Sequence, residues 1–489
     1  MSRRTHSRHT VGDPPDRTTR RGILTGAGMA AGMAAGLGAA GAMAPRPALA
    51  APEQRLRSYY DVRDFGATGD GNADDQPAIQ DAIDAASASA DGLPQGGGAV
   101  VFLPSGLYRV GRTLRIEKSN VGLVGIGAGS VIQGAAAEGH IIYAGTPDPS
   151  TPVRNVFFEH FAVTAAVRKV SGAGIFCEHA ERYRIDDVKA APQEVGPGPL
   201  YDAFYFRFFD TCVLSNVMAI AHHAGVTLHG KPNQSYGAGF WLIGGSRVIA
   251  DLEKGSVGVH IGGSSGGIVL EDVDVIVNET NVLIDDALSG TINREIFLNQ
   301  CFIDSASGHG LDVAAGSVAL LHLNNTWVSA SGRNVFGTPD PPPSDGFPRG
   351  NNINYRSDPD AAAPNRRGLN TVIVDGCRIF NAYGSGIAAG SGKWIITGSN
   401  VLYNGLGKNG GHGIALLGDQ VSEAIINANI VSDNGSPEGE PSRQLGEGIH
   451  IGPGVRNYIV THNIVRDNAT GQIVDRGRGN KIVKDNLTN

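Results

Sequence analysis

The residues that could do chemistry are concentrated between positions 202 and 312. Short runs of alternating apolar residues recur there, each opening on a small residue or an asparagine. Alternation along a strand turns the second residue after that opening residue outward, and the fourth lies beside it on the same face. The first outward column then reads Tyr205, Thr227, His260, Leu283 and Asp312, and the second reads Arg207, His229, Gly262 and Asp285. Positions just before the runs add Asp202, His223, Glu279 and His309, and later runs add only His412, Glu447 and His450 among Ala and Gly.

Paired carboxylates suggest cleavage or transfer of a glycosidic bond, because one donates a proton while the other activates water or attacks carbon. Asp285 and Asp312 stand on adjacent runs and two residues apart, which predicts a separation of about 8 Å, within the spacing for inversion. His309, just before its run, is predicted to orient the substrate beside this catalytic pair. The residues predicted to bind substrate are Asp202, Tyr205, Arg207, His223, His229, Lys231, Trp241, His260 and Glu279.

Two other functions fit the same face. Elimination in a polysaccharide needs a base and a cation that neutralises charge, and Arg207, His223, His229 and Lys231 could fill those roles. A carbohydrate-binding protein without catalysis would use the same polar groups. No dense acidic cluster resembles a calcium site, so no metal or cofactor is predicted.

The elements that carry these residues repeat at intervals of about 22–27 residues, as from Ala203 to Gly225 and from Gly386 to Gly413. Short alternating runs joined by Asn- and Gly-rich corners predict parallel strands that stack coil on coil, because no coil is stable alone. A single domain over 58–489 follows, after a linker at 51–57. A stretch rich in Pro, Asp and Gly at 337–367 is predicted to be an inserted loop, because the repeat resumes after it.

The segment from Tyr60 to Gly71, the Asp74–Ile83 stretch and the run from Gly97 to Tyr108 resemble the N-terminal signature of the pectate-lyase-like, polygalacturonase-related β-helix superfamily. The resemblance implies an all-β, right-handed parallel β-helix that acts on carbohydrate. A short helix at 74–87 is expected to cap its open end.

The catalytic motifs of the polygalacturonase-like enzymes do not carry over. Asp285-Asp286 and Gly308-His309-Gly310 resemble two of them, but the aspartate pair follows its strand instead of preceding it, and no N-T-D lies upstream. Only His309 matches in position.

The first fifty residues resemble a twin-arginine export signal, with Arg20-Arg21, a mildly apolar stretch, and Ala48-Leu49-Ala50 before the expected cleavage. The chain holds 40 basic and 47 acidic residues, of which this segment has seven Arg and two Asp. The remainder therefore carries 33 basic and 45 acidic residues, a net charge of −12. This net negative charge argues against nucleic acid and membrane surfaces as partners. The family resemblance and the export signal together predict a carbohydrate partner outside the cell.

Four cysteines have no zinc-type spacing, and a protein folded before export meets a reducing cytosol. We therefore expect Cys177, Cys212, Cys301 and Cys377 to be free and buried, the last three in one register. Because β-helix enzymes of this superfamily are sometimes trimers, a homo-oligomer is also possible.

Overall fold

The computed structural model describes residues 58–91, 98–192, 199–231, 239–250, 253–285, 292–332, 350–357, 370–407, 410–435 and 446–489. All of them lie in one compact unit, Leu56–Asn489. The predicted export signal and linker fall outside the described residues. No helix in the described part of the chain is long and apolar enough to cross a membrane.

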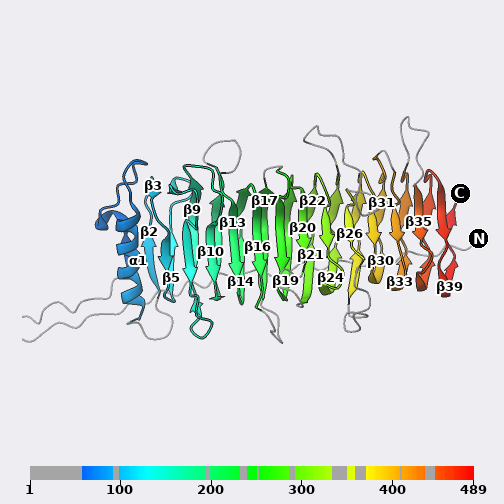
Figure 1. Ribbon diagram of the computed structural model, residues 1–489, viewed down its shortest axis with the longest axis horizontal. Helices are drawn as coiled ribbons and strands as arrows, with labels where there is room; N and C mark the ends of the chain where they lie inside the picture. Colours follow the sequence, from blue (N-terminus) through cyan, green and yellow to red (C-terminus); the bar gives the residue numbers. More distant parts are fainter. Residues whose placement is uncertain are drawn as a thin grey trace, which may run out of the picture. The chain divides into compact units, whose positions relative to one another are not determined.

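The described strands pair in parallel and form two long sheets, which confirms the predicted parallel β-helix (Figure 1). Sheet 1 has thirteen strands, each hydrogen-bonded to the corresponding strand of the next coil. Its strands are β4 (Leu114–Ile116), β7 (Ile142–Gly145), β10 (Ala173–Glu178), β13 (Asp202–Arg207), β16 (Ala224–His229), β18 (Val257–Gly262), β20 (Thr280–Ile284), β23 (Leu311–Val313), β26 (Ile353–Tyr355), β29 (Ile387–Ala389), β32 (Ile414–Leu416), β35 (Glu447–Ile451) and β38 (Gly471–Asp475).

Sheet 2 has twenty-five strands and forms the other walls of the coils. Its first half comprises β1 (Tyr59–Asp61), β2 (Ala99–Phe102), β3 (Gly106–Val110), β5 (Val121–Val124), β6 (Ser130–Gly134), β9 (Phe157–Ala165), β12 (Arg184–Ala190), β14 (Cys212–Ser215), β15 (Met218–Ala221), β17 (Phe240–Ala250), β19 (Ile268–Ile276), β21 (Asn293–Asn299) and β22 (Phe302–Asp304). Its second half comprises β24 (Val318–Asn324), β25 (Trp327–Ser329), β27 (Thr371–Asp375), β28 (Arg378–Phe380), β30 (Gly392–Thr397), β31 (Asn400–Leu402), β33 (Val421–Asn427), β34 (Ile430–Ser432), β36 (Arg456–Thr461), β37 (Ile464–Arg466), β39 (Arg478–Lys484) and β40 (Leu487–Thr488). A separate pair joins β8 (Val153–Arg154) to β11 (Ala180–Glu181).

The core is built from columns of apolar residues that repeat once per coil. In sheet 1, Val226 pairs with Val259, Val259 with Val282, and Val282 with Leu311, all with no exposed surface. Branched side chains suit this pleated, half-buried position. Burying each such side chain stabilises the fold by about 1.5–3 kcal/mol. The columns form one core that runs through the whole stack of coils.

Asparagine ladders close the corners inside the coils. The Asn404 backbone N–H and side-chain amide both donate to the Asn434 amide oxygen at 3.0 Å, and Asn434 repeats this pattern on Asn468 at 3.1 and 2.9 Å. A second ladder runs from Asn429 through Asn463. These ladders satisfy the buried backbone groups that the turns leave unpaired.

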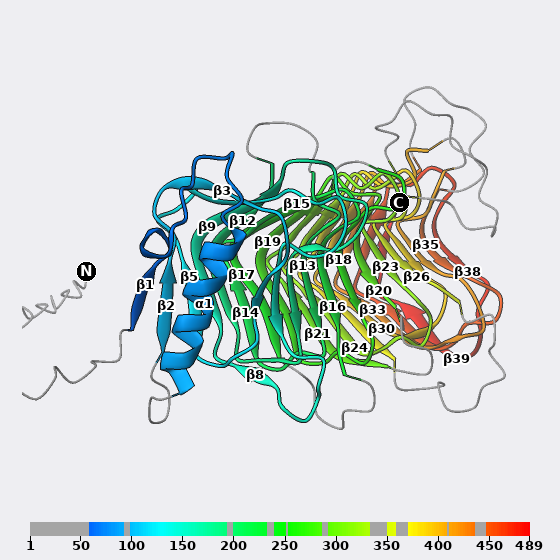
Figure 2. The same cartoon turned by 60° about the vertical axis from the view of Figure 1, so that its left-hand side comes forward.

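One helix, α1 (Gln76–Asp91), packs against the first coils, following a 3-10 turn, η1 (Val62–Phe65) (Figure 2). It begins and ends a few residues later than the predicted 74–87. Ile79 and Ile83 are fully buried in the core that the coils share. Asp74 accepts from the backbone N–H groups of Gln76 and Gly111, and Asp75 accepts from those of Thr68 and Gly69. These aspartates are structural.

The four cysteines are free and buried, as predicted. The predicted single register is only partly correct, because Cys212 lies level with Phe240. Cys301 and Cys377 share a corner column with Thr326 between them: the Cys301 backbone N–H donates to the Thr326 hydroxyl, and the strands that follow these three residues pair in one row.

The predicted inserted loop contains a strand of sheet 1. β26 pairs with β23 on one side and β29 on the other, so residues 350–357 continue the stack instead of leaving it. The sequence signal was hidden because Pro- and Gly-rich segments flank this short strand on both sides. The rest of 337–367 lies outside the described residues.

Candidate functional site

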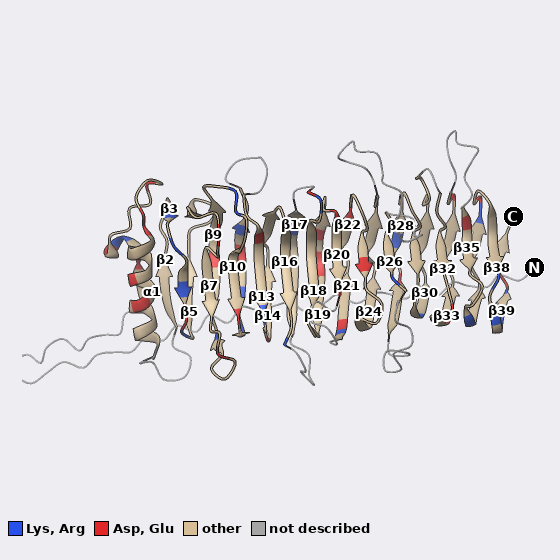
Figure 3. Cartoon of the chain, viewed as in Figure 1, with Lys and Arg blue, Asp and Glu red and all other residues tan. Residues whose placement is uncertain are grey.

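The outward face of sheet 1 carries the polar columns at the registers that strand alternation predicts. Tyr205 pairs with Thr227, Thr227 with His260, His260 with Leu283, and Leu283 with Asp312. Beside them Arg207 pairs with His229, and His229 with Gly262. Charged side chains of both signs are interspersed along the coils (Figure 3).

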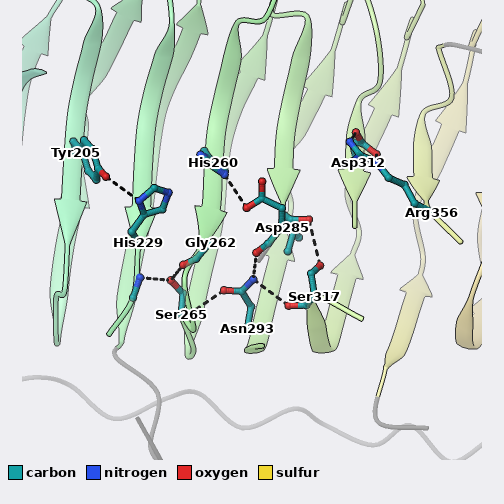
Figure 4. Close-up of polar contacts among 12 residues, drawn as sticks. Tyr205, His229, His260, Gly262, Ser265, Asp285, Asn293, Asp312, Ser317 and Arg356 are labelled. Atoms are coloured by element: carbon teal, nitrogen blue, oxygen red, sulfur yellow. Dashed lines mark hydrogen bonds and ion pairs between the residues drawn. The ribbon is translucent and has the colours of Figure 1, made fainter. Parts of the chain in front are cut away.

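Four side chains from successive strands meet in a row (Figure 4). The Tyr205 hydroxyl lies 2.8 Å from Nδ1 of His229, and Nε2 of His260 lies 3.0 Å from an Asp285 carboxylate oxygen. The His229 and His260 rings meet edge to face with centroids 5.1 Å apart. This row therefore links a phenol to a carboxylate through two imidazoles.

Burial shifts the pKa values of Tyr205 and His229, the first two residues of this row. Desolvation and, secondarily, the neighbouring His260 lower the pKa of His229 to about 4, so its imidazole is neutral at physiological pH. Desolvation raises the pKa of Tyr205, so its hydroxyl keeps its proton. Nε2 of His229 is buried and has no hydrogen-bond partner in the described structure. In the described structure the polar contact of the His229 ring is therefore made at Nδ1, with the Tyr205 hydroxyl.

A turn beneath the row fixes where the strands end. The Asn293 amide donates to the backbone carbonyl of Asp285 at 2.7 Å and to that of Ser317 at 3.0 Å, while its oxygen accepts from the Ser265 N–H (Figure 4). Three successive coils are joined in this way. The backbone that presents Asp285 is consequently held from below.

Arg207 contacts residues on earlier strands that the columns read from the sequence did not include. Its guanidinium contacts the carboxylate of Glu178, which is 6% exposed and also accepts from the Tyr143 hydroxyl at 3.0 Å. Phe176 packs edge to face against Tyr205 with centroids 5.0 Å apart. Tyr143 and Phe176 continue the Tyr205 column onto earlier strands, a signal that extending the columns before residue 202 would have revealed.

Asp312 is held by two residues from β26 and the segment after it. Arg356 contacts both of its oxygens, and the Asn354 amide donates to it at 2.8 Å. Burial works to raise the pKa of Asp312, but the hydrogen bond and charge of Arg356, with His309 nearby, hold that pKa below its usual value. Asp312 is thus an ionised, bound carboxylate on the strand next to Asp285. Sequence reasoning missed Arg356 and Asn354 because both lie in the range taken as a loop.

The residues just before the strands lie along one edge of the face. Asp202 contacts Nδ1 of His223 at 2.7 Å, and Tyr201 stacks on that ring with centroids 4.2 Å apart. Nδ1 of His309 accepts from the Asn351 N–H at 3.2 Å. The Glu279 carboxylate accepts from the Gly255 N–H, which fixes a turn. Lys231 is half-buried at the end of β16.

Trp241 is separate from this face. It lies in β17 of sheet 2, between Val213 and Val269, so the structure does not bring it to the predicted groove. The apolar run that contains it has the same alternation as the sheet 1 runs, which is why its sheet could not be assigned from the pattern.

A cavity of about 600 Å³ opens where α1 meets the first strand of sheet 1. Its lining includes Arg112, Arg115, His140 and Lys169. Arg115 heads the Tyr143–Phe176–Tyr205 column, and His140 stacks on Phe176 with centroids 4.1 Å apart. Two residues of the cavity lining, Arg115 and His140, therefore lie next to the first members of this column.

Known proteins resemble this chain in two ways. A model of the family described as rhamnogalacturonase A/epimerase, pectate lyase-like matches residues 59–169. Alginate lyase 7 of Azotobacter vinelandii is 48% identical over 79 residues, and mannuronan C5-epimerase AlgE1 of the same organism is 49% identical over 80 residues. Each alignment covers 15% of this chain, and the chain spans only 8% and 5% of those relatives' lengths.

Solved structures share the fold over most of the chain. The A-module of mannuronan C-5 epimerase AlgE6 from A. vinelandii has a TM-score of 0.54 at 16% identity, covering 88% of this chain and 99% of that one. The pre-mature gene product 12 of bacteriophage phi29 has a TM-score of 0.50 at 14% identity, covering 83% and 52%. At these identities the neighbours show a shared fold, in agreement with the stacked coils of this chain. The described part of the chain is thus a parallel β-helix, and its residues 59–169 are similar to the pectate lyase-like family.

Proposed function

We propose that the protein is a carbohydrate-active enzyme that acts on a polyuronate by removing the proton at C5 of a uronosyl residue. Loss of the 4-linked sugar would complete an elimination, whereas return of a proton to the opposite face would give an epimer. The observation that carries the proposal is the Tyr205–His229 pair beside the half-exposed guanidinium of Arg207. The relatives named for alginate lyase and mannuronan epimerase activity support the same substrate class.

The chemistry requires a base and a cation. Abstraction at C5 places negative charge on the adjoining carboxylate, which a guanidinium neutralises best because its N–H groups form a planar fork. Glu178 engages one side of Arg207, and the side chain remains 43% exposed, so donors are available for a substrate carboxylate.

Tyr205 would be the residue that touches the substrate. Its oxygen takes the C5 proton while its own proton passes to Nδ1 of His229, so charge and protons balance. Burial opposes the imidazolium that forms, and the charge of Asp285, together with that of a bound substrate carboxylate, would stabilise it. His229, which is half-buried with its Nε2 atom fully covered, would be a positioning residue and proton acceptor. In an elimination, the tyrosyl hydroxyl so regenerated can protonate the departing oxygen.

Hydrolysis by Asp285 and Asp312 is the competing function. A general acid for glycoside cleavage needs a raised pKa, but Arg356 and Asn354 keep that of Asp312 low. Asp285 is paired with His260. These contacts favour proton abstraction over the hydrolytic pair.

The cavity beside α1 suits one end of the polymer. From β4 to β13 three strand steps span about 14 Å, the length of a short oligosaccharide. Arg112, Arg115 and Lys169 would bind uronate carboxylates there; Asp81 and Glu138 also line the cavity, and Arg115 is paired with Glu117.

The test is an assay of the purified protein on a panel of polyuronates and neutral polysaccharides. Elimination gives an unsaturated, ultraviolet-absorbing product, and epimerisation exchanges the C5 hydrogen for deuterium in D₂O. Either result on a polyuronate supports the proposal. New reducing ends with neither the ultraviolet-absorbing product nor the deuterium exchange would establish hydrolysis instead. No reaction on any polyuronate would contradict the proposal.

A variant pair assigns the reaction to its residues. Tyr205→Phe keeps the ring and removes the hydroxyl, so turnover should fall by at least about 100-fold. Tyr403→Phe, half-exposed after β31, is the matched control and should leave the rate unchanged. If Tyr205→Phe kept its rate while Asp285→Asn and Asp312→Asn lost theirs, the carboxylate pair would be the catalytic one.

A further inference from the structure

Two histidines and a glutamate converge on later coils, away from the proposed site. His412 precedes β32, while Glu447 and His450 belong to β35, the next strand of sheet 1. Their side chains are 7%, 12% and 13% exposed. Each offers one ligand atom, and these three atoms lie within 4.8 Å of one another.

The hydrogen bonding at His412 places its unprotonated ring nitrogen beside the Glu447 carboxylate. Nδ1 of His412 accepts from the Glu447 backbone N–H at 3.3 Å, so this nitrogen carries a lone pair and not a proton. The same nitrogen lies 3.4 Å from Oε2 of the Glu447 carboxylate. Both atoms can donate an electron pair to a cation, and a metal ion at Nδ1 would replace the long hydrogen bond from the Glu447 N–H.

The third member of the group turns toward the same oxygen. Nδ1 of His450 contacts Oε2 of Glu447, and the two imidazole rings stack with centroids 4.6 Å apart. The other oxygen, Oε1, is 4.0 Å from the Arg476 guanidinium, so the guanidinium lies on the Oε1 side and Oε2 faces the two histidines.

We propose that His412, Glu447 and His450 bind one divalent transition-metal ion, with Zn²⁺ the best fit. Two imidazoles and one carboxylate form a ligand set that zinc accepts and calcium does not. Three protein ligands leave one position of a tetrahedron for water. This departs from the expectation that the chain has no metal site. No sequence motif spans the interval between His412 and Glu447, and only the pairing of β32 with β35 brings the ligands together.

The ion would join two consecutive coils, because one ligand comes from the coil of β32 and two come from the coil of β35. Four strand steps, about 20 Å, separate β32 from β20 and Asp285. Binding is therefore independent of the proposed reaction. Since the metal binds only the folded arrangement, it should raise the melting temperature as its concentration rises.

Calorimetric titration of the chelator-treated full chain with ZnCl₂ tests the proposal. We expect one ion per chain, with affinity at least about 100-fold lower in Glu447→Gln and His450→Gln, which each remove a ligand. Glu423→Gln is the charge-matched control, since Glu423 is exposed and paired with Lys393 in sheet 2. Cobalt substitution adds a signature, because tetrahedral Co²⁺ absorbs visible light and that absorption should be missing in His450→Gln.

Circular dichroism establishes that each variant is folded. Should Glu447→Gln fail to fold, His450→Gln decides the question, because its side chain is the most exposed of the three. A chain that takes up no zinc, or variants that bind zinc as tightly as Glu423→Gln, would overturn the proposal.

Discussion

Single side chains on the outer face of sheet 1 are held by partners from a neighbouring strand. Asp312 is held by Arg356, Glu178 by Arg207, Asp202 by His223 and Asp285 by His260. In the first two pairs the carboxylate is buried and the cation reaches solvent. The carboxylates therefore fix the positions of the cations, and the exposed cations are the groups that the proposed anionic substrate would meet.

Replacing Asp312 by Asn tests how firmly one such pair holds. The change leaves Arg356 without its ionic partner, so we expect the free energy of unfolding in urea to drop by about 1–3 kcal/mol. Asp274→Asn is the control, because its pair with Arg247 is more exposed and should contribute under about 1 kcal/mol. Equal losses in the two variants would show that burial of Asp312 adds nothing.

The same pair makes a prediction about pH. The pKa of Asp312 is lower in the folded protein than in the unfolded chain, where it is about 3.9. Its contribution to stability is therefore complete above that value and is lost as the pH falls through the folded pKa. The stability difference between the wild type and Asp312→Asn should be constant from about pH 5 to 7 and shrink below about pH 4. A difference that persists unchanged at lower pH would contradict this.

Among whole elements, the corner ladders turn separate coils into one cooperative stack. Asn434 has no exposed surface, and its amide makes bonds to Asn404, Asn468 and the Val401 carbonyl. Asn434→Ala would leave these buried groups unpaired, and should lower the free energy of unfolding by about 2–4 kcal/mol. Asn400→Ala, on the outward side of β31, should cost less than about 0.5 kcal/mol. Similar values for both would mean that the ladder is not a source of stability.

Strand alternation predicted the columns of sheet 1, because a residue's direction along a strand depends only on its parity. Alternation cannot say which sheet a run joins, so Trp241 was assigned to the wrong face. Arg356 and Asn354 follow from tertiary pairing, since a strand as short as β26 has no pattern of its own. The contacts that define the site, such as Tyr205 with His229, depend on rotamers and burial that one sequence does not encode locally.

For the molecule as a whole, protection should decline along the solenoid toward β38–β40. Every described residue of β39 and β40 is exposed, whereas β13 and β16 are mostly buried and α1 covers the first coils. Hydrogen exchange read by mass spectrometry should therefore be fastest in β38–β40 and slowest in β13–β20. Uniform protection would indicate that the last coil is covered by a partner. Sedimentation would then test the predicted homo-oligomer.

The asparagine ladder makes neighbouring coils interchangeable. Asn352 donates to Asn404 as Asn404 donates to Asn434, and Ile353, Ile387 and Ile414 follow one another in the core. A gene that lost the codons for residues 386–412 would thus bring Asn434 beneath Asn352 and Ile414 beneath Ile353, with like replacing like. Unequal exchange within such a gene can lengthen or shorten the groove by whole coils, while Tyr205, His229 and Asp285 keep their mutual geometry. The length of the proposed site along a polymer could then evolve separately from its chemistry.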